Sequence, residues 1–201
     1  MAKKLLIAAI ILLATLLAWV LWFWQPAGDE GQPAVALASA PTGGEFTLQS
    51  AGGPLALKDL RGKVVLVYFG YTFCPDICPT SLAFTAQALK MLDEKELEQT
   101  RVLFVSVDPA RDTPEKLKEY GAFFHPNIIG LTGTPQEIAA VAKLYGASYA
   151  RQDTGSASGY VVDHSSSTYV VDPTGKMVAT LQHGTLPMEV AKAIRAAMQA
   201  K

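Results

Sequence analysis

The fold is decided by residues 63–79, which read Lys63-Val64-Val65-Leu66-Val67-Tyr68-Phe69-Gly70-Tyr71-Thr72-Phe73-Cys74-Pro75-Asp76-Ile77-Cys78-Pro79. Residues 63–70 form a continuous apolar and β-branched run, which is typical of a strand buried on both faces of a sheet. A helical pattern is predicted from Thr80 to Glu98, with one apolar face made of Leu82, Ala86, Leu89 and Leu92. The cysteines therefore lie where a buried strand passes into a helix, and the N–H groups and dipole of a helix start stabilise a thiolate over a thiol.

Cys74 and Cys78 are the two cysteines of the chain, and their spacing predicts a redox or metal-binding role rather than a structural disulfide. Residues at i and i+4 can turn both sulfurs to one side of a first helical turn, which suits a reversible disulfide or a two-thiolate metal site. The extra residue relative to the C-x-x-C pattern of oxidoreductases favours metal. A structural disulfide would close a very small loop and remove little chain entropy. An inert pair is the third interpretation, but free thiols rarely persist unused in an oxidising compartment.

The N-terminus predicts that the domain is exported. Residues 5–24 contain no charge and are long enough, as a helix, to cross the roughly 30 Å hydrocarbon core. Lys3 and Lys4 precede this run, so residues 1–4 are expected to stay in the cytoplasm. We therefore predict a single-pass protein of the bacterial inner membrane whose domain faces the periplasm. The alternative is a cleaved signal peptide, with Ala-x-Ala sites at residues 36–40.

Downstream of the anchor, residues 25–44 are rich in Ala, Pro and Gly and are expected to be a flexible linker, followed by one domain over residues 45–201. Strands alternate with helices there, which predicts an α/β domain with a mixed central sheet flanked by helices and an N-terminal β-hairpin. The expected strands are residues 46–48, 55–57, 63–70, 101–107, 128–131, 168–171 and 177–181. Further helices are expected from residues 114 to 124, 135 to 145 and 187 to 200, and residues 151–158 form a polar stretch.

His164 is the histidine that the sequence places best for a metal site. It follows Val162-Asp163 and precedes the strand of Tyr169, in a loop expected to reach the cysteine end of the sheet. Asp163 or a nearby carbonyl could fix its tautomer. His125 and His183 are expected to be ordinary loop residues, and the methionines at positions 91, 177 and 188 are too scattered for a soft-metal cluster.

Two thiolates and one imidazole discriminate between metals. Soft sulfur ligands select copper(I) or zinc, whereas calcium, magnesium and manganese prefer oxygen. A structural zinc site needs four ligands, and no obvious fourth cysteine or histidine is present, so copper is favoured and zinc with an open position stays as the alternative. The net charge of −1 and the lack of a basic stripe exclude nucleic acid as a partner.

The sequence resembles the Sco/SenC family of copper-binding cytochrome c oxidase assembly proteins. The resemblance is carried by Leu60 to Pro79, by Val105 to Pro114, and by Asp163-His164 with Tyr169 to Pro173. It implies a thioredoxin-like fold in which Cys74, Cys78 and His164 bind copper, as Cu(I) or Cu(II). It further implies that the copper-centre subunit of the oxidase is a partner, with other periplasmic copper carriers or thiol reductants beside it.

Three functions are weighed on this basis. The leading one is a metallochaperone, a binding protein and not an enzyme, that helps to assemble the dinuclear copper centre of the oxidase. The second is a thiol–disulfide oxidoreductase that reduces the cysteines of that centre through the redox-active pair Cys74 and Cys78. The third, a peroxidase-like activity, lacks an identifiable arginine-assisted pocket. Ser166 falls, by similarity, where thioredoxin-like oxidoreductases carry a cis-proline, and this departure favours metal binding.

Overall fold

The computed structural model describes residues 2–23, 41–155 and 159–200, in two units that we treat separately. The first is helix α1, Ala2–Phe23, which contains the apolar run and is long and apolar enough to cross a membrane. Residues 5–23 of the expected anchor segment lie in this helix, whereas Trp24 and residues 25–40 of the expected linker lie outside the described residues.

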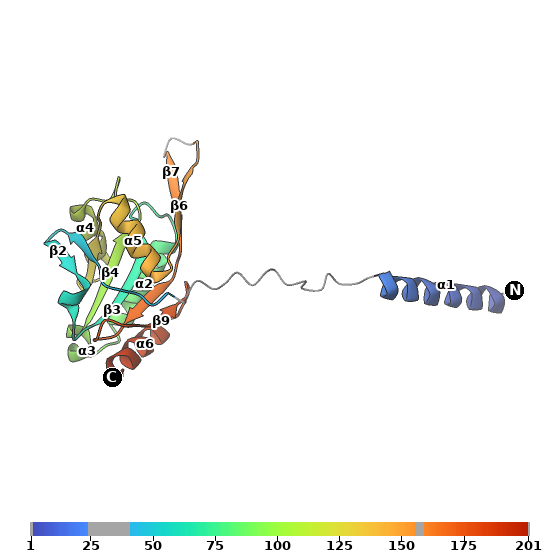
Figure 1. Ribbon diagram of the computed structural model, residues 1–201. Coiled ribbons are helices and arrows are strands. Elements are labelled where there is room, and N and C mark those ends of the chain that lie inside the picture. The colour runs from blue at the N-terminus through green and yellow to red at the C-terminus, as the bar shows by residue number, and fades with distance from the viewer. Residues whose placement is uncertain (1, 24–40, 156–158, 201) are drawn as a thin grey trace. The chain divides into compact units, whose positions relative to one another are not determined.

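The second unit is built on a five-stranded mixed sheet in the order β5-β4-β3-β8-β9, with β3 and β4 running through the middle of the domain in Figure 1. Strands β3 (Val64–Gly70), β4 (Thr100–Ser106) and β5 (Ile128–Leu131) run parallel, while β8 (Thr168–Val171) and β9 (Met177–Leu181) are antiparallel. Every residue of β3 is buried, so the central position expected for the apolar run is confirmed. The mixed α/β class predicted from the sequence is also confirmed.

Helices cover this sheet, and two of them begin at the predicted caps. Helix α4 (Pro114–Phe124) starts after Thr113, and helix α5 (Pro135–Tyr145) starts after Thr134, whose hydroxyl accepts a hydrogen bond from the backbone N–H of Glu137. Helix α6 (Pro187–Gln199) packs against α2 (Ile77–Leu89) and contacts β3 and β8. The N-terminal hairpin also forms, from β1 (Thr47–Ser50) and β2 (Gly53–Ala56), followed by the 3₁₀ turn η1 (Leu57–Leu60).

The single helix expected from Thr80 to Glu98 was wrong. Helix α2 begins at Ile77 and ends at Leu89, and a separate short helix, α3, spans Glu94–Glu98. The break has a local cause, because the Asp93 carboxylate accepts a hydrogen bond from the backbone N–H of Glu96 and starts a new helix there. The earlier start of α2 brings Cys78 inside the helix, which matters for the site.

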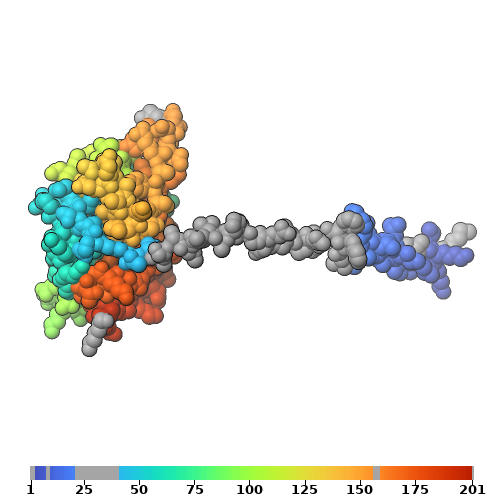
Figure 2. All heavy atoms as spheres, viewed as in Figure 1, coloured from blue at the N-terminus to red at the C-terminus, as the bar shows by residue number. Residues whose placement is uncertain are grey.

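The polar stretch after α5 was also misjudged, because its first residues, Arg151 to Asp153, belong to a strand of a hairpin. Strands β6 (Tyr149–Asp153) and β7 (Tyr160–His164) pair antiparallel and project from the body of the domain, as Figures 1 and 2 show. Residues 156–158, between the two strands, lie outside the described residues. Within β7, Val162 is buried, whereas Tyr149 to Asp153 of β6 are mostly exposed, so the alternating apolar signal of a strand is weak.

Candidate metal centre

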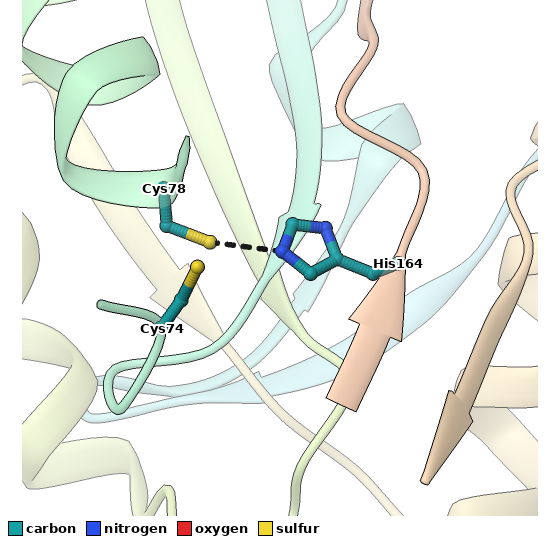
Figure 3. A group of neighbouring side chains, drawn as sticks. All are labelled: Cys74, Cys78 and His164. Carbon is teal, nitrogen blue, oxygen red and sulfur yellow. Dashed lines mark hydrogen bonds between the residues drawn. The ribbon is translucent and has the colours of Figure 1, made fainter. Parts of the chain in front are cut away.

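The two cysteines lie on either side of the start of α2. Cys74 belongs to the loop after β3 and precedes the helix, whereas Cys78 is the second helical residue. The spacing had suggested that the two cysteines share a helical turn, and this expectation was wrong. The loop folds back instead, since the backbone N–H of Cys74 donates to the carbonyl of Tyr71, and the two sulfurs still converge, as Figure 3 shows.

A buried carboxylate holds this loop in place. Asp112, which is 0% exposed, accepts hydrogen bonds from the backbone N–H of Thr72 at 3.0 Å, from its hydroxyl at 2.5 Å, and from the hydroxyl of Ser106 at 2.6 Å. Ser106 ends β4, so one side chain joins the end of the neighbouring strand to the residues just before Cys74. The sequence offered Asp112 only as part of a family resemblance, and its supporting role was missed.

Arg111 makes a second connection, from the same loop to strand β7. Its guanidinium pairs with Asp108, donates to the carbonyl of Tyr160 at 3.0 Å, and lies 3.7 Å from the centre of the Tyr160 ring. The same guanidinium is 4.9 Å from the ring of Phe73, the residue before Cys74. The Tyr160 hydroxyl in turn donates to Asp108 at 2.7 Å. These contacts fix the first residue of the strand that ends at the histidine, and sequence reasoning did not identify them.

His164 was predicted to lie in a loop, but it is the last residue of β7. Its side chain faces the cysteines, as Figure 3 shows. Its Nδ1–H donates to the carbonyl of Ser165 at 2.9 Å, so in the neutral ring the Nε2 lone pair is directed into the site. Nε2 lies 3.2 Å from the sulfur of Cys78. The rings of Tyr68 and Tyr71 approach the imidazole edge-on, at 6.2 and 5.8 Å between centroids. Of the two tautomer partners expected, the carbonyl is the one found, and not Asp163.

The three ligand atoms form one cluster. The sulfurs of Cys74 and Cys78 and a ring nitrogen of His164 all lie within 4.8 Å of one another, and no other His, Cys, Asp or Glu of the described chain belongs to this group. The three residues that sequence reasoning selected are thus brought together. A soft monovalent ion fits such a set, because two sulfur donors and one imidazole surround a common point.

The electrostatics of the pair favour a single thiolate. A hydrogen bond from the Cys78 thiol lowers the pKa of Cys74 to about 4, although burial opposes this, and contacts from His164 and from the backbone N–H groups of Asp76 and Cys78 lower it further. The same bond and burial raise the pKa of Cys78 far above its ordinary value. These opposite shifts favour a thiolate at Cys74 and a proton kept by Cys78.

One side of the cluster is accessible. A cleft of about 320 Å³ opens onto it, lined among others by Tyr71, Cys74, Pro75, Ile77 and His164. Cys74 is 8% exposed and Cys78 is 0% exposed, so a partner approaching through the cleft meets Cys74 first.

The remaining histidines lie elsewhere, as predicted. His125 follows α4, and its Nδ1 accepts a hydrogen bond from the backbone N–H of Asn127. His183 follows β9 and shares a hydrogen bond of 3.0 Å with the Ser81 hydroxyl. Neither of them is part of the three-residue cluster.

Comparison with known proteins points to one family. The SCO1/SenC family model matches residues 35–199. The chain is 42% identical, over 148 residues, to "Protein SCO2, mitochondrial" of Saccharomyces cerevisiae, an alignment that covers 73% of this chain and 49% of the yeast protein. The chain thus spans about half the length of that relative.

Solved structures of this family are similar to the chain in fold as well as in sequence. Bradyrhizobium japonicum ScoI with copper bound is 36% identical, with a TM-score of 0.70, over 78% of this chain and 99% of that one. BsSco, described as a member of the Sco family of cytochrome c oxidase assembly proteins and reported with a disulfide switch, is 27% identical with a TM-score of 0.62, over 81% and 96% of the two chains. The thioredoxin-like fold expected from the sequence is confirmed by these neighbours.

The low pKa of Cys74 makes a direct prediction about reactivity. Alkylation of the reduced, metal-free protein by iodoacetamide should modify Cys74, with a rate half-maximal near pH 4 and almost constant between pH 6 and 8. The alkylation rate of an ordinary thiol, with a pKa of about 8.5, would instead rise about 100-fold between pH 6 and pH 8. Mass spectrometry would locate the modified residue.

The matched variant is Cys78→Ala, which removes the thiol that donates to Cys74. In this variant the pKa of Cys74 should return towards the ordinary range, so the alkylation rate of Cys74 should rise steeply between pH 6 and 8. A steep rise already present in the wild-type protein would contradict the shared-proton arrangement.

Proposed function

Because this chain belongs to the SCO1/SenC family, we propose that it is a copper metallochaperone that carries the ion on Cys74, Cys78 and His164 and serves cytochrome c oxidase assembly. The family is tied to that assembly and to copper binding. The dinuclear copper centre of the oxidase is the acceptor we propose. Copper is the cargo of the protein in this account, not a resident catalyst.

One observation supports the proposal above the others: two sulfurs and an imidazole nitrogen meet within 4.8 Å at the end of the central strand. Copper(I) accepts three such soft and borderline donors, whereas a closed structural zinc site uses four. The Ser165 carbonyl keeps the proton on Nδ1 and leaves Nε2 free to bind a metal ion. Cys74 already has thiolate character, so binding requires the release of one thiol proton, from Cys78.

The unequal exposure of the ligands suits transfer. An acceptor thiolate entering the cleft reaches the Cys74 side of the cluster, while Cys78 is enclosed by the protein. Replacement of the Cys74 sulfur would therefore come first, with Cys78 and His164 holding the ion until a second acceptor ligand arrives. Such stepwise exchange keeps copper coordinated throughout and avoids its release as a free ion.

The same pair supports a second function, thiol–disulfide exchange. The Cys74 thiolate would attack a partner disulfide to give a mixed disulfide and release one partner thiolate. Cys78, after losing its proton, would then attack Cys74, which releases the second partner thiol and leaves a Cys74–Cys78 disulfide. Two electrons pass to the partner in this sequence. The depressed pKa of Cys74 is the observation that favours it.

We also propose that α1 anchors the domain to the inner membrane, with the domain in the periplasm. Its support is the length and apolar composition of the helix and the two lysines, Lys3 and Lys4, at its start. Copper insertion into a subunit assembled at a membrane is consistent with an anchored donor. A signal sequence has the same appearance, so the choice requires a test.

The anchor is tested by extraction and by a topology reporter. The full-length protein should stay in the membrane pellet through alkaline carbonate, because the helix is held by the hydrocarbon core. Alkaline phosphatase fused after Lys201 should be active, and it should lose activity when residues 2–24 are deleted. Release of the protein into the carbonate supernatant would contradict the anchor.

The metal site is tested by anaerobic copper(I) titration against a competing chelator. Reduced wild-type protein should bind one ion tightly, and His164→Ala should weaken binding by about 100-fold or more, because it removes one of three ligands. Affinity should also fall as the pH falls, since protons compete for sulfur and imidazole. The control is His183→Ala, which lies outside the cluster and should bind as the wild type does.

The same copper(I) titration is repeated on the oxidised protein and compared with the reduced protein. Fully oxidised protein, with Cys74 and Cys78 joined, offers no thiolate and should lose tight binding. Unchanged affinity in either His164→Ala or the oxidised protein would mean that copper binds elsewhere. A His164→Ala protein that keeps full disulfide-reducing activity while losing copper would identify the two functions as separable.

A further inference from the structure

Tyr68 carries a polar group that the described structure leaves unsatisfied. Its side chain is 1% exposed, and its hydroxyl has no hydrogen-bond partner among the described residues. Buried hydroxyl groups normally have a partner, because an unpaired one has lost its water without compensation. The unpaired hydroxyl of Tyr68 lies beside the proposed metal ligands, and its burial there needs a physical explanation.

Tyr68 and the Cys78 sulfur lie next to each other on one face of the sheet. Side chains alternate along β3, so Tyr68 and Gly70 point to the same side, and Cys78 packs onto that side from α2. A Cβ atom added at Gly70 would lie 2.7 Å from the Cys78 sulfur and 3.1 Å from Cε1 of the Tyr68 ring. Glycine therefore lets the sulfur and the edge of the phenol come together over the strand.

Two groups are close enough to interact with the hydroxyl, namely Cys78 and Ser81. Burial is the main cause that raises the pKa of Tyr68, so its hydroxyl keeps its proton and can donate a hydrogen bond. Ser81 already shares a hydrogen bond of 3.0 Å with Nδ1 of His183. The sulfur of Cys78 is the other group within reach, and the sulfur of a neutral thiol is only a weak acceptor.

We propose, on the basis of the copper site above, that Tyr68 is a positioning residue whose hydroxyl donates a hydrogen bond to the Cys78 sulfur when copper holds it as a thiolate. An anionic sulfur is a far better acceptor than a thiol, so metal loading would turn Cys78 into the partner that the hydroxyl lacks in the described structure. The hydroxyl is unsatisfied in the metal-free state and satisfied in the loaded state. Its burial thereby favours the loaded state over the empty one.

The test compares Tyr68→Phe with wild-type protein, using the full chain in detergent. The metal-free variant should be at least as stable to heat as the wild type, because only an unpaired hydroxyl is removed. Copper(I) affinity should fall about tenfold, and the rise in melting temperature on copper loading should shrink. In the copper(II)-loaded form, the sulfur-to-copper absorption band should move to longer wavelength, since an unbonded sulfur releases its electrons more easily.

Tyr145→Phe is the matched control, another fully buried tyrosine whose hydroxyl instead donates to the carbonyl of Gly44. It should lower the stability of the metal-free protein and leave copper affinity and the absorption band unchanged. Ser81→Ala should leave both copper readouts unchanged. If Ser81→Ala reproduced the effects of Tyr68→Phe, the partner of the phenol would be the serine and the inference would be wrong.

The outcomes separate this inference from the proposed function. Wild-type protein that binds no copper would overturn the copper site itself. Wild-type protein that binds copper, together with a Tyr68→Phe variant of equal affinity and an unmoved absorption band, would overturn the role of Tyr68 alone.

Discussion

The 3.2 Å contact between the sulfur of Cys78 and Nε2 of His164 joins two segments that are 86 residues apart in sequence. The supporting interactions around the site maintain this approach. Asp112 holds the loop before Cys74 to the end of β4, and Arg111 holds the same loop to the start of β7. Loss of either connection would let the loop or the histidine strand move, and a cluster of three ligand atoms tolerates little displacement.

The site also carries an electrostatic cost that its surroundings offset. A thiolate placed at the edge of a buried core is disfavoured by loss of water. The Cys78 thiol and the backbone N–H groups at the start of α2 stabilise the Cys74 anion. A second anion at Cys78 is disfavoured by its hydrogen bond to Cys74 and by burial, which together raise the pKa of Cys78. A bound cation would supply the missing charge, so the protein is organised for an ion that neutralises two sulfurs together.

Much of this could be predicted from the sequence, because the signals were local. The apolar run of β3, the caps at Thr113 and Thr134, and the cysteine pair each follow from a few adjacent residues. The break between α2 and α3 was missed because the apolar helical face runs up to Leu92, directly before Asp93, and Asp93 starts the next helix. The β6–β7 hairpin was missed because its strands are mostly exposed and polar. The connections through Asp112, Arg111 and Tyr68 depend on neighbours distant in sequence, which no local pattern reveals.

X-ray absorption spectroscopy at the copper edge of the copper(I)-loaded, reduced protein reports which atoms are bound to the metal. We predict a first coordination shell of two sulfurs and one nitrogen, with the imidazole scattering lost in His164→Ala and kept in His183→Ala. A first shell without sulfur, or with sulfur alone in the wild-type protein, would contradict the three-ligand site formed by Cys74, Cys78 and His164.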